Sequence, residues 1–297
     1  MDVSIIIVNY NTLKMTQECI ESVFRETKGV EYEIILVDNA SNDGSKAYFE
    51  KDSRIKYVYN SSNLGFGRAN NIGYKFTKGK YIFLLNSDTI LISNIILHFY
   101  RFMEEQDKSI ACVGCELIGP KGNMVISYGE FPTMSLILKQ RLSLFIPKKY
   151  RKCYGYNGKY RKKIAENCYI VDYITGADLF IRKEVIEQCG LFDPDFFFYY
   201  EETEMQYRYK KSHFCSCVLL QSQIIHLEGG SGNNKKNNHL VHARKAMSSI
   251  FIYMRKTHGS SYYRAFRLLF FLISLPSFFI FSYPLKDRLL YLKELLA

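Results

Sequence analysis

The chain has 297 residues, 47% of them apolar, and a formal net charge of +11 at pH 7. This length suits one large α/β domain with a small appendage and leaves little room for two full enzymatic domains. The apolar fraction is sufficient for a sizeable core. The positive charge favours an anionic partner, such as nucleic acid, acidic lipid headgroups or a phosphorylated small molecule, and does not choose among these.

The eight cysteines do not have the pattern of a disulfide framework. Residues 1–4 lead directly into a strand-like run without the features of a signal peptide, so we expect reduced thiols in a cytosolic compartment. Cys112 with Cys115, and Cys215 with Cys217, resemble halves of a zinc site. Their spacing does not supply a clean set of four ligands.

The N-terminal part of the chain alternates between strand and helix patterns. Buried β-branched runs predict strands, and helical spacing predicts helices between them. The strands are expected at residues 3–8, 33–38, 55–59 and 81–85, and the helices at residues 13–27, 45–52 and 67–78. This alternation predicts an α/β fold with an open, mostly parallel sheet and helices on both faces. Ligands of such sheets bind beyond the carboxyl ends of the strands, where Asn9, Asn11, Asp38 and Asp88 fall.

The order of elements is less regular after residue 110. Strands are expected at residues 110–118, 169–174, 179–181 and 217–225, and helices near residue 183 and at residues 201–211 and 239–257. Residues 131–165 are expected to be irregular, and residues 229–238 to form a flexible polar loop. We divide the chain into a main domain, residues 1–238, and a C-terminal helical segment, residues 239–297.

An uncharged run of 18 residues extends from Leu268 to Leu285, with basic residues on both sides. Its length reaches the lower limit for a membrane-spanning helix, but Pro276 in its middle argues against a straight one. Basic flanks suit a segment that lies in an anionic membrane face. The alternative is a hydrophobic helical hairpin packed on the main domain.

Three side chains at strand ends are candidates for binding chemistry. Asp88 could hold a divalent cation that neutralises a diphosphate leaving group, or could cap a turn or helix. Asp38 could accept a hydrogen bond from a base or a ribose, or could be a simple turn residue. His226 could bind a metal or a phosphate, although a lone histidine is usually structural.

An acidic run, with Glu201, Glu202 and Glu204, follows five aromatic residues. Apolar rings desolvate a carboxylate, raise its pKa and suit it to take a proton from a hydroxyl. The alternative is the acidic first turn of a helix, which the helix dipole favours. The basic, tyrosine-rich stretch 148–163 is expected to be a solvated loop, because no nucleic-acid-binding module surrounds it.

Taken together, these segments resemble the family 2 glycosyltransferases, in particular the rhamnosyltransferase-like branch that builds bacterial surface polysaccharides. The resemblance covers about residues 1–232, with its motifs in the right order. The matching segments are residues 3–11, 35–45, 63–71, 84–88, 175–177, 190–193 and 200–204, together with His226 and residues 229–231.

The resemblance implies a GT-A fold over residues 1–238. It makes Asp38 a contact of the nucleotide base, Asp88 the metal-binding end of a DXD-type motif, and Glu202 the general base. It makes His226 a contact of the diphosphate or of the metal, which would be Mg²⁺ or Mn²⁺. The remaining implied contacts are Val8, Asn9, Asn11, Asn39, Gly65, Asn70, Asn86 and Ser87 toward the nucleotide sugar, and Gly176, Ala177 and Glu201 toward the acceptor.

Three residues depart from the usual pattern of the family. The DXD-type motif reads Asn86-Ser87-Asp88, so a single carboxylate remains. Glu202 stands where the family often has Asp, and Asn70 stands where many members have Arg. These departures put the strength of metal binding, the reach of the base and a phosphate contact in question.

The implied reaction is a single in-line displacement in which Glu202 takes the proton of the acceptor hydroxyl and the anomeric configuration inverts. Rhamnose from dTDP-rhamnose is the first candidate donor and UDP-sugars the second. The acceptor is expected to be a saccharide or a lipid-linked saccharide, and the location the inner face of the cell membrane, peripherally bound. Nucleic acid is not an expected partner.

Three other readings compete with this one. A Rossmann dehydrogenase needs G-x-G-x-x-G after the first strand, where this chain has Asn9-Tyr10-Asn11-Thr12. A glycoside hydrolase needs a pair of carboxylates across the scissile bond. A membrane-attached scaffold with a degraded site is the non-enzymatic alternative.

Overall fold

The computed structural model describes residues 1–143, 145–146, 162–227, 238–280, 292–293 and 295. Its helices are α1 (Leu13–Glu26), α2 (Ser45–Phe49), α3 (Phe66–Tyr74), α4 (Ile95–Glu105), α5 (Met134–Ser143), α6 (Lys183–Cys189), α7 (Glu201–Lys211), α8 (Asn238–His258) and α9 (Ser260–Ile280). Its strands are β1 (Val3–Asn9), β2 (Tyr32–Asp38), β3 (Lys56–Tyr59), β4 (Tyr81–Asn86), β5 (Thr89–Leu91), β6 (Ile110–Ile118), β7 (Tyr128–Gly129), β8 (Lys162–Ala165), β9 (Cys168–Val171), β10 (Tyr173–Ile174), β11 (Asp178–Arg182) and β12 (Cys215–His226).

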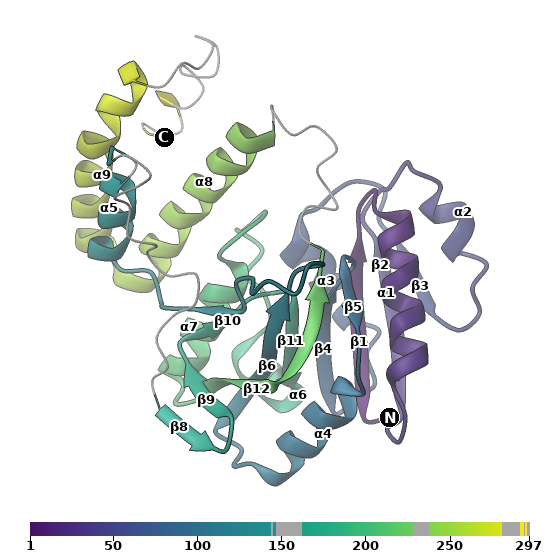
Figure 1. Cartoon of the computed structure of the whole chain (residues 1–297). Coiled ribbons are helices and arrows are strands. Elements are labelled where there is room, and N and C mark those ends of the chain that lie inside the picture. The colour runs from purple at the N-terminus through teal and green to yellow at the C-terminus, as the bar shows by residue number, and fades with distance from the viewer. Residues whose placement is uncertain (144, 147–161, 228–237, 281–291, 294, 296–297) are drawn as a thin grey trace.

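Parallel strands form the N-terminal half of the main sheet, in the order β3-β2-β1-β4. β1 is buried on both faces because helices cover both sides. Ile5 and Ile7 pack into a core with residues of α1 and α4, whereas Ile6 packs into a second core with residues of α3, α6 and α7. This alternation follows from the period of two along a strand, and it confirms the predicted sheet with helices on both faces (Figure 1).

The sheet continues as β11-β6-β12-β9-β8, with β5 paired to β12. In this half β11 is antiparallel to both β4 and β6, while β12 runs parallel to β6. Within the described residues the result is a mixed sheet of ten strands flanked by helices. A separate two-stranded sheet pairs β7 with β10.

The register of the strands gathers the predicted polar residues at one edge. Asn9 lies opposite Asp38, and Val8 lies opposite Asn86, because the carboxyl ends of β1, β2 and β4 are aligned. His226 at the end of β12 lies opposite Thr89 of β5. The fold therefore places the ends of four strands around one site.

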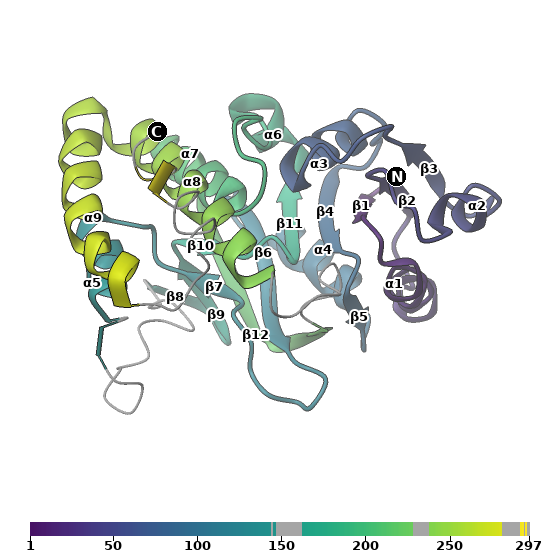
Figure 2. The ribbon, with the colours of Figure 1, turned by 90° about the horizontal axis from the view of Figure 1, so that it is seen from above.

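Helices α5, α8 and α9 form a third, separate core beside the sheet, visible apart from it in both views (Figures 1 and 2). This core contains Ile137 of α5, Phe251 of α8 and Phe266 of α9, together with Phe196 from the loop before α7. It joins residues from both sides of the predicted domain boundary at residue 238.

The expectation that residues 131–165 are irregular is wrong for α5 and β8. α5 has a weak helical pattern, since Ile137 is its one buried residue. Its contacts with α9, including a hydrogen bond of 3.0 Å from the Arg141 Nε to the Ser274 hydroxyl, stabilise it instead. α4, β5 and β7 were also not predicted.

The expected apolar membrane segment at the C-terminus is not supported. Within the ranges that the structure describes, no helix combines the length and the apolar character needed to span a membrane. α9 contains Pro276 and buries Phe266 and Phe270 against α8. α9 packs on α5 and α8, and a hairpin formed by the uncharged run stays a prediction. Residues 281–285 of the uncharged run, most of the stretch 148–163 and the loop 229–237 lie outside the described residues.

Candidate active site

Asn9 and Asn11 organise the loop after β1. The buried Asn9 side chain donates a hydrogen bond to the Ser41 hydroxyl at 3.0 Å and accepts one from the Thr12 hydroxyl at 2.8 Å. Asn11 adopts a positive φ of 56°, and its side-chain oxygen accepts the N–H of Asn42 at 2.8 Å. These contacts give both side chains a structural role in joining the loops after β1 and β2. Contact with a donor stays a prediction for them and for the half-buried Val8.

Asp38, at the end of β2, is a fully buried carboxylate. One oxygen accepts the N–H of Ser41 at 2.8 Å, and the other accepts the Tyr57 hydroxyl at 2.8 Å. Burial, with the hydrogen bond to Asp38, raises the pKa of Tyr57 well above its usual range, so Tyr57 remains a donor. Each carboxylate oxygen has a further lone pair, and the predicted base contact would use one.

Asn39 and Gly65 hold two loops together beside Asp38. Asn39 is buried, and its amide group donates to the Asn63 side chain at 2.9 Å and accepts the Leu64 N–H at 3.1 Å. Gly65 has φ of 86°, and a Cβ there would lie 2.2 Å from the carbonyl oxygen of Phe197. Only glycine satisfies both constraints.

Asn70 is buried in α3 and donates to the carbonyl of Phe66 in its own helix, at 3.0 Å. This bond keeps its amide within α3. Contact of Asn70 with the nucleotide sugar stays a prediction.

Asp88 and His226 come from distant parts of the chain and meet at the end of β12. The His226 Nε2 lies 3.2 Å from the Asp88 Oδ1, and each side chain is 16% exposed. The N–H of Leu227 donates to the carbonyl of Asp88 at 2.9 Å, which also holds the end of β12 next to Asp88. Ser87 stands beside them, with its hydroxyl 3.2 Å from that of Thr12. The two predicted metal ligands are thus together.

Asp88 and His226 together supply two ligands for a metal at this position. No group of three or more His, Cys, Asp or Glu side chains that could hold a metal occurs among the described residues. Asp88 and His226 offer one carboxylate and one imidazole, and the oxygens of a bound diphosphate are the hard ligands that Mg²⁺ and Mn²⁺ accept. The pair fits a cation that is shared with such a ligand.

Glu201 and Glu202 begin α7 in a desolvated setting. Burial raises the pKa of Glu202 to about 7, although the backbone N–H groups of Glu202 and Thr203 lower it in part. Burial and the neighbouring Glu202 raise the pKa of Glu201 well above its usual range. The Oε2 atom of Glu201 is buried without a hydrogen-bond partner among the described residues. Burial therefore disfavours the charged form of both carboxylates, and the pKa of Glu202 lies near neutral pH.

A short turn, residues 175–177, connects this carboxylate to the Asp88 side of the site. A Cβ on Gly176 would lie 3.8 Å from the Cβ of Glu202. The carbonyl of Ala177 accepts the N–H of Asn86 at 3.0 Å. The turn thus lies near the Cβ of Glu202 and is also bonded to the segment Asn86-Ser87-Asp88.

The loop before α7, residues 190–200, is called the aromatic loop below. Its last two residues, Tyr199 and Tyr200, have φ values of 71° and 68°. Each non-glycine residue in this left-handed region costs about 1–3 kcal/mol, and the conformation persists only where surrounding contacts impose it. Contacts of the aromatic loop therefore decide where the following Glu201 and Glu202 lie.

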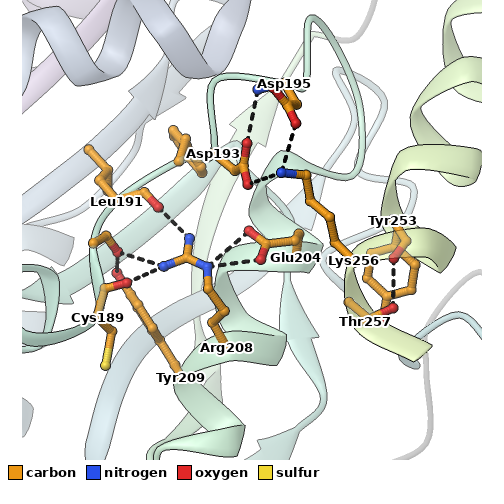
Figure 3. Close-up of polar contacts among 12 residues, drawn as sticks. Cys189, Leu191, Asp193, Asp195, Glu204, Arg208, Tyr209, Tyr253, Lys256 and Thr257 are labelled. Atoms are coloured by element: carbon orange, nitrogen blue, oxygen red, sulfur yellow. Dashed lines mark hydrogen bonds and ion pairs between the residues drawn. The ribbon is translucent and has the colours of Figure 1, made fainter. Parts of the chain in front are cut away.

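Polar groups of α7 and α8 hold the beginning of the aromatic loop (Figure 3). The Arg208 guanidinium donates to the carbonyls of Cys189 and Leu191 and to the carboxylate of Glu204 at 2.9 Å. Lys256 of α8 forms ion pairs of 2.7 Å with Asp193 and with Asp195. Charged side chains of two helices thus meet on one short loop.

Sequence reasoning missed three residues that shape this site. Asp178 is fully buried at the start of β11, where burial raises its pKa to about 7. Gln206 of α7 donates to the carbonyl of Glu202 at 3.0 Å, and Lys256 of α8 pairs with Asp193 and Asp195 of the aromatic loop. Position directly after the motif 175–177 could have indicated Asp178, whereas nothing in the sequence indicated the other two.

The comparisons with known proteins agree with this geometry. Residues 4–169 match the family described as Glycosyl transferase family 2. The glycosyltransferase GlyG of Streptococcus pneumoniae serotype 4 is 33% identical over 112 residues, which cover 36% of this chain and 37% of that protein. A low-salt glycan biosynthesis hexosyltransferase of Haloferax volcanii is 28% identical over 216 residues, covering 71% of this chain and 62% of that protein. This chain spans less than two thirds of the length of either relative.

Solved structures share the fold at low sequence identity. TarS of S. aureus in complex with UDP has a TM-score of 0.57 and 15% identity, with 99% of this chain and 79% of that chain covered. A mannosyltransferase of Pyrobaculum calidifontis in complex with GDP-Man and Mn²⁺ has a TM-score of 0.57 and 11% identity, with 98% and 78% covered. This likeness establishes a GT-A fold. Since the family match covers more than half of the residues, the chain belongs to glycosyl transferase family 2.

Proposed function

We propose that this chain is an inverting glycosyltransferase that moves a sugar from a nucleotide diphosphate donor to a hydroxyl group of an acceptor. The observation that carries the proposal is the turn 175–177. It lies near Glu202, whose pKa is about 7, and is hydrogen-bonded to the segment that ends at Asp88. A proton acceptor and a diphosphate site near one turn suit a single displacement reaction.

Glu202 is the proposed general base. A carboxylate with a pKa near the working pH combines a large ionised fraction with enough basicity to accept the proton of a hydroxyl. The acceptor oxygen then attacks the anomeric carbon from the face opposite the diphosphate, and the configuration inverts. The raised pKa of Glu201 beside it disfavours a second negative charge on the acceptor side of the site.

Asp88 and His226 are the proposed holders of Mg²⁺ or Mn²⁺. A bound cation would supply charge neutralisation for the diphosphate leaving group. The support is the distance of 3.2 Å between the two side chains, and the Mn²⁺ in the solved mannosyltransferase of the same fold.

The donor is proposed to carry a hexose. Rhamnose follows from the resemblance of the motifs to the rhamnosyltransferase-like branch, and a UDP-sugar follows from the UDP in the solved TarS complex. The acceptor is proposed to be a saccharide or lipid-linked saccharide of polysaccharide biosynthesis. The glycan biosynthesis named for the Haloferax volcanii relative supports this class.

A lipid-linked acceptor would bring the enzyme to the inner face of the cell membrane. α9 presents Leu268, Leu269 and Leu272 to solvent with exposed fractions of 60%, 40% and 51%. Exposed leucines beside the basic Arg264 suit peripheral contact with an anionic lipid surface.

A nucleotide-sugar-binding scaffold without turnover is the second candidate. The single carboxylate of Asn86-Ser87-Asp88 favours it over other non-enzymatic functions, because metal binding is weaker with fewer carboxylates.

A panel of nucleotide sugars with Mg²⁺ or Mn²⁺ tests the proposal. Purified protein is expected to release the nucleoside diphosphate from one donor, and a chelator is expected to stop the release. Proton NMR of the product then reports the anomeric configuration, and retention would contradict the inverting mechanism. Donor binding without release, with acceptor saccharides present, would favour the scaffold.

A further inference from the structure

We infer that α8 positions the general base: Lys256 and Ser249 hold the aromatic loop in the conformation that sets Glu202 beside the turn 175–177. This inference rests on the proposed role of Glu202, and it assigns a catalytic purpose to a helix outside the residues that match the family, 4–169. Lys256 and Ser249 are positioning residues, since neither contacts the reacting atoms.

Lys256 anchors the early part of the aromatic loop. Its Nζ lies 2.7 Å from an oxygen of Asp193 and 2.7 Å from an oxygen of Asp195 (Figure 3). Asp193 also accepts the N–H of Asp195 at 2.9 Å, so the lysine closes a compact turn around Pro194. The side chains of Lys256 and Asp193 are 28% and 22% exposed, which limits screening by solvent.

Ser249 anchors the late part of the aromatic loop, directly before the strained residues. Its hydroxyl donates to the carbonyl of Phe198 at 2.8 Å, and Ser249 itself is buried. One turn further along α8, the ring of Tyr253 packs 5.9 Å from that of Tyr200. The face of α8 with Ser249, Tyr253 and Lys256 therefore follows the loop along most of its length.

Helix α3 also holds the aromatic loop. Arg68 donates to the carbonyl of Pro194 at 2.7 Å, and Asn71 donates to the carbonyl of Phe192 at 2.7 Å. The N–H of Phe66 donates to the carbonyl of Phe197 at 3.2 Å. The loop thus lies between α3, which begins beside Gly65, and α8.

This arrangement explains how Tyr199 and Tyr200 keep their left-handed backbone. Neither residue is glycine, so the conformation depends on anchors on both sides. Without the contacts from α8, the loop is held by α3 and α7 alone, and the tyrosines can relax to ordinary φ values. The first turn of α7, with Glu202, follows directly and would shift with them.

The groups that face Glu202 determine how its pKa would change if the first turn of α7 moved. They are Glu201 of α7, Tyr173 of β10, and Tyr199 and Tyr200 of the aromatic loop, and no lysine or arginine is among them in the part of the chain that the structure describes. Burial is the main cause of the raised pKa of Glu202. Loosening the loop admits water, which lowers that pKa toward the usual value of a glutamate.

The test compares Lys256→Met with Lys256→Arg, Ser249→Ala and Arg255→Met in the full chain. Arg255 is the exposed neighbour of Lys256 on α8, and its charge helps to lower the pKa of Asp195, so Arg255→Met is a control for charge near the loop. Lys256→Met is expected to lower kcat by about tenfold or more, because a small displacement of a base is costly, and to leave the KM for the donor within about twofold. The acid limb of its pH profile is expected to move to lower pH. Lys256→Arg should recover much of kcat, Ser249→Ala should act in the same direction, and Arg255→Met should match the wild type.

Two results would overturn the inference. One is a wild-type kcat and pH profile in both Lys256→Met and Ser249→Ala. The other is an equal loss in Arg255→Met, which would indicate a charge effect without positioning. If Lys256→Met does not fold, Ser249→Ala decides by the same criteria.

Hydrogen exchange separates this inference from the proposed function, since it needs no turnover. The N–H of Glu204 donates to the carbonyl of Tyr200 at 2.8 Å, and that of Phe196 to the carbonyl of Asp193 at 3.3 Å. Both amides are expected to exchange faster in Lys256→Met than in Arg255→Met. If the wild type releases no nucleoside diphosphate while these rates differ, the proposed function fails and the anchoring of the loop by α8 stands. Equal exchange rates in Lys256→Met and Arg255→Met would contradict the anchoring of the loop by α8, whatever the enzymatic activity.

Discussion

The side chain of Gln206 forms two hydrogen bonds with the backbone of Ile174, as a neighbouring strand would. It accepts the N–H of Ile174 at 2.9 Å and donates to its carbonyl at 2.8 Å. The same amide nitrogen lies 3.0 Å from the carbonyl of Glu202, and Gln206 is 1% exposed. α7 is thereby fixed to β10, directly before the turn 175–177. The distance between the proposed base and this turn depends on that bond pair.

Gln206→Ala is expected to destabilise the protein by about 3 kcal/mol, because two buried backbone groups of Ile174 lose their partners. The free energy of unfolding from denaturant titration measures this. Gln188→Ala removes an exposed glutamine of α6 and is the matched control, with little change expected. Equal stabilities of the two variants would show that water or another group replaces the amide.

The rate of transfer is expected to depend on an ionisation near pH 7. Glu202 must be deprotonated to accept a proton, and burial raises its pKa to about 7, so kcat should rise as the pH increases through 7. The pH profile of kcat with saturating substrates measures it. An acid limb near 4.5, the ordinary value for a glutamate, would contradict the desolvated setting.

Asp178→Asn is expected to stabilise the protein at high pH. Burial raises the pKa of Asp178 from 3.8 to about 7, so the folded state binds a proton that the unfolded state has lost between these values. The free energy of unfolding of the wild type should therefore fall as the pH rises from 4 to 7, by about 1.4 kcal/mol for each unit of pKa shift at most. The N–H of Cys115 donates to Asp178 at 2.7 Å, and the side-chain oxygen of the introduced amide can still accept this bond.

The comparison is made by denaturant titration at pH 5 and pH 8. The variant should gain on the wild type at pH 8 relative to pH 5. Some pH dependence should remain, because Glu201 also has a raised pKa. An identical loss of stability between pH 5 and pH 8 in both proteins would show that a group other than Asp178 causes the pH dependence.

Asp88→Asn is expected to remove the effect of Mn²⁺ on UDP binding. In the wild type, Mn²⁺ with UDP should raise the melting temperature more than UDP alone, since a ligand of the folded state stabilises it. The Asp88→Asn protein should show only the effect of UDP. The exposed Asp107, changed to Asn, is the control that should behave as the wild type. A wild-type response in Asp88→Asn would exclude Asp88 as a ligand.

Contact with a membrane can be read directly because the chain contains no tryptophan. Leu272→Trp places a single indole on α9 at a site 51% exposed, and Tyr48→Trp places one on α2 at a site 43% exposed. Vesicles with an anionic phosphatidylglycerol surface should shift the emission of the first variant to the blue and leave the second unchanged. Equal responses, or none, would contradict a membrane-facing α9.

Much of the fold could be predicted because it depends on local patterns. The β-branched run of residues 3–8 is typical of a strand buried on both faces of a sheet. The acidic residues 201–204 mark the start of a helix. α5 could not be predicted, since Ile137 is its one buried residue and α9 supplies its contacts. The apolar run of α9 did not separate a spanning helix from a packed one, because Phe266 and Phe270 of α9 are buried in a core with α5 and α8.

The candidate site was predictable to the extent that its residues lie in short motifs. Asp88 and His226 were each indicated by their positions at strand ends, and the structure brings them to 3.2 Å. Asn9 and Asn39 lie in similar motifs, but their side chains form hydrogen bonds that hold loops together. The motif alone does not distinguish a ligand-binding residue from one that stabilises a loop. Lys256 could not be found, because its function depends on a loop more than fifty residues away in the sequence.

Release of nucleoside diphosphate by the wild type and by Glu202→Gln, from the donor that each protein binds, tests the central claim most directly. Loss of a general base is expected to lower the rate by about 10²–10⁴-fold, while the Kd for the donor stays within about twofold because Glu202 is proposed to contact the acceptor. That result would establish Glu202 as the base of a nucleotide-sugar-dependent transfer. Equal rates in the two proteins, with equal donor binding, would contradict it.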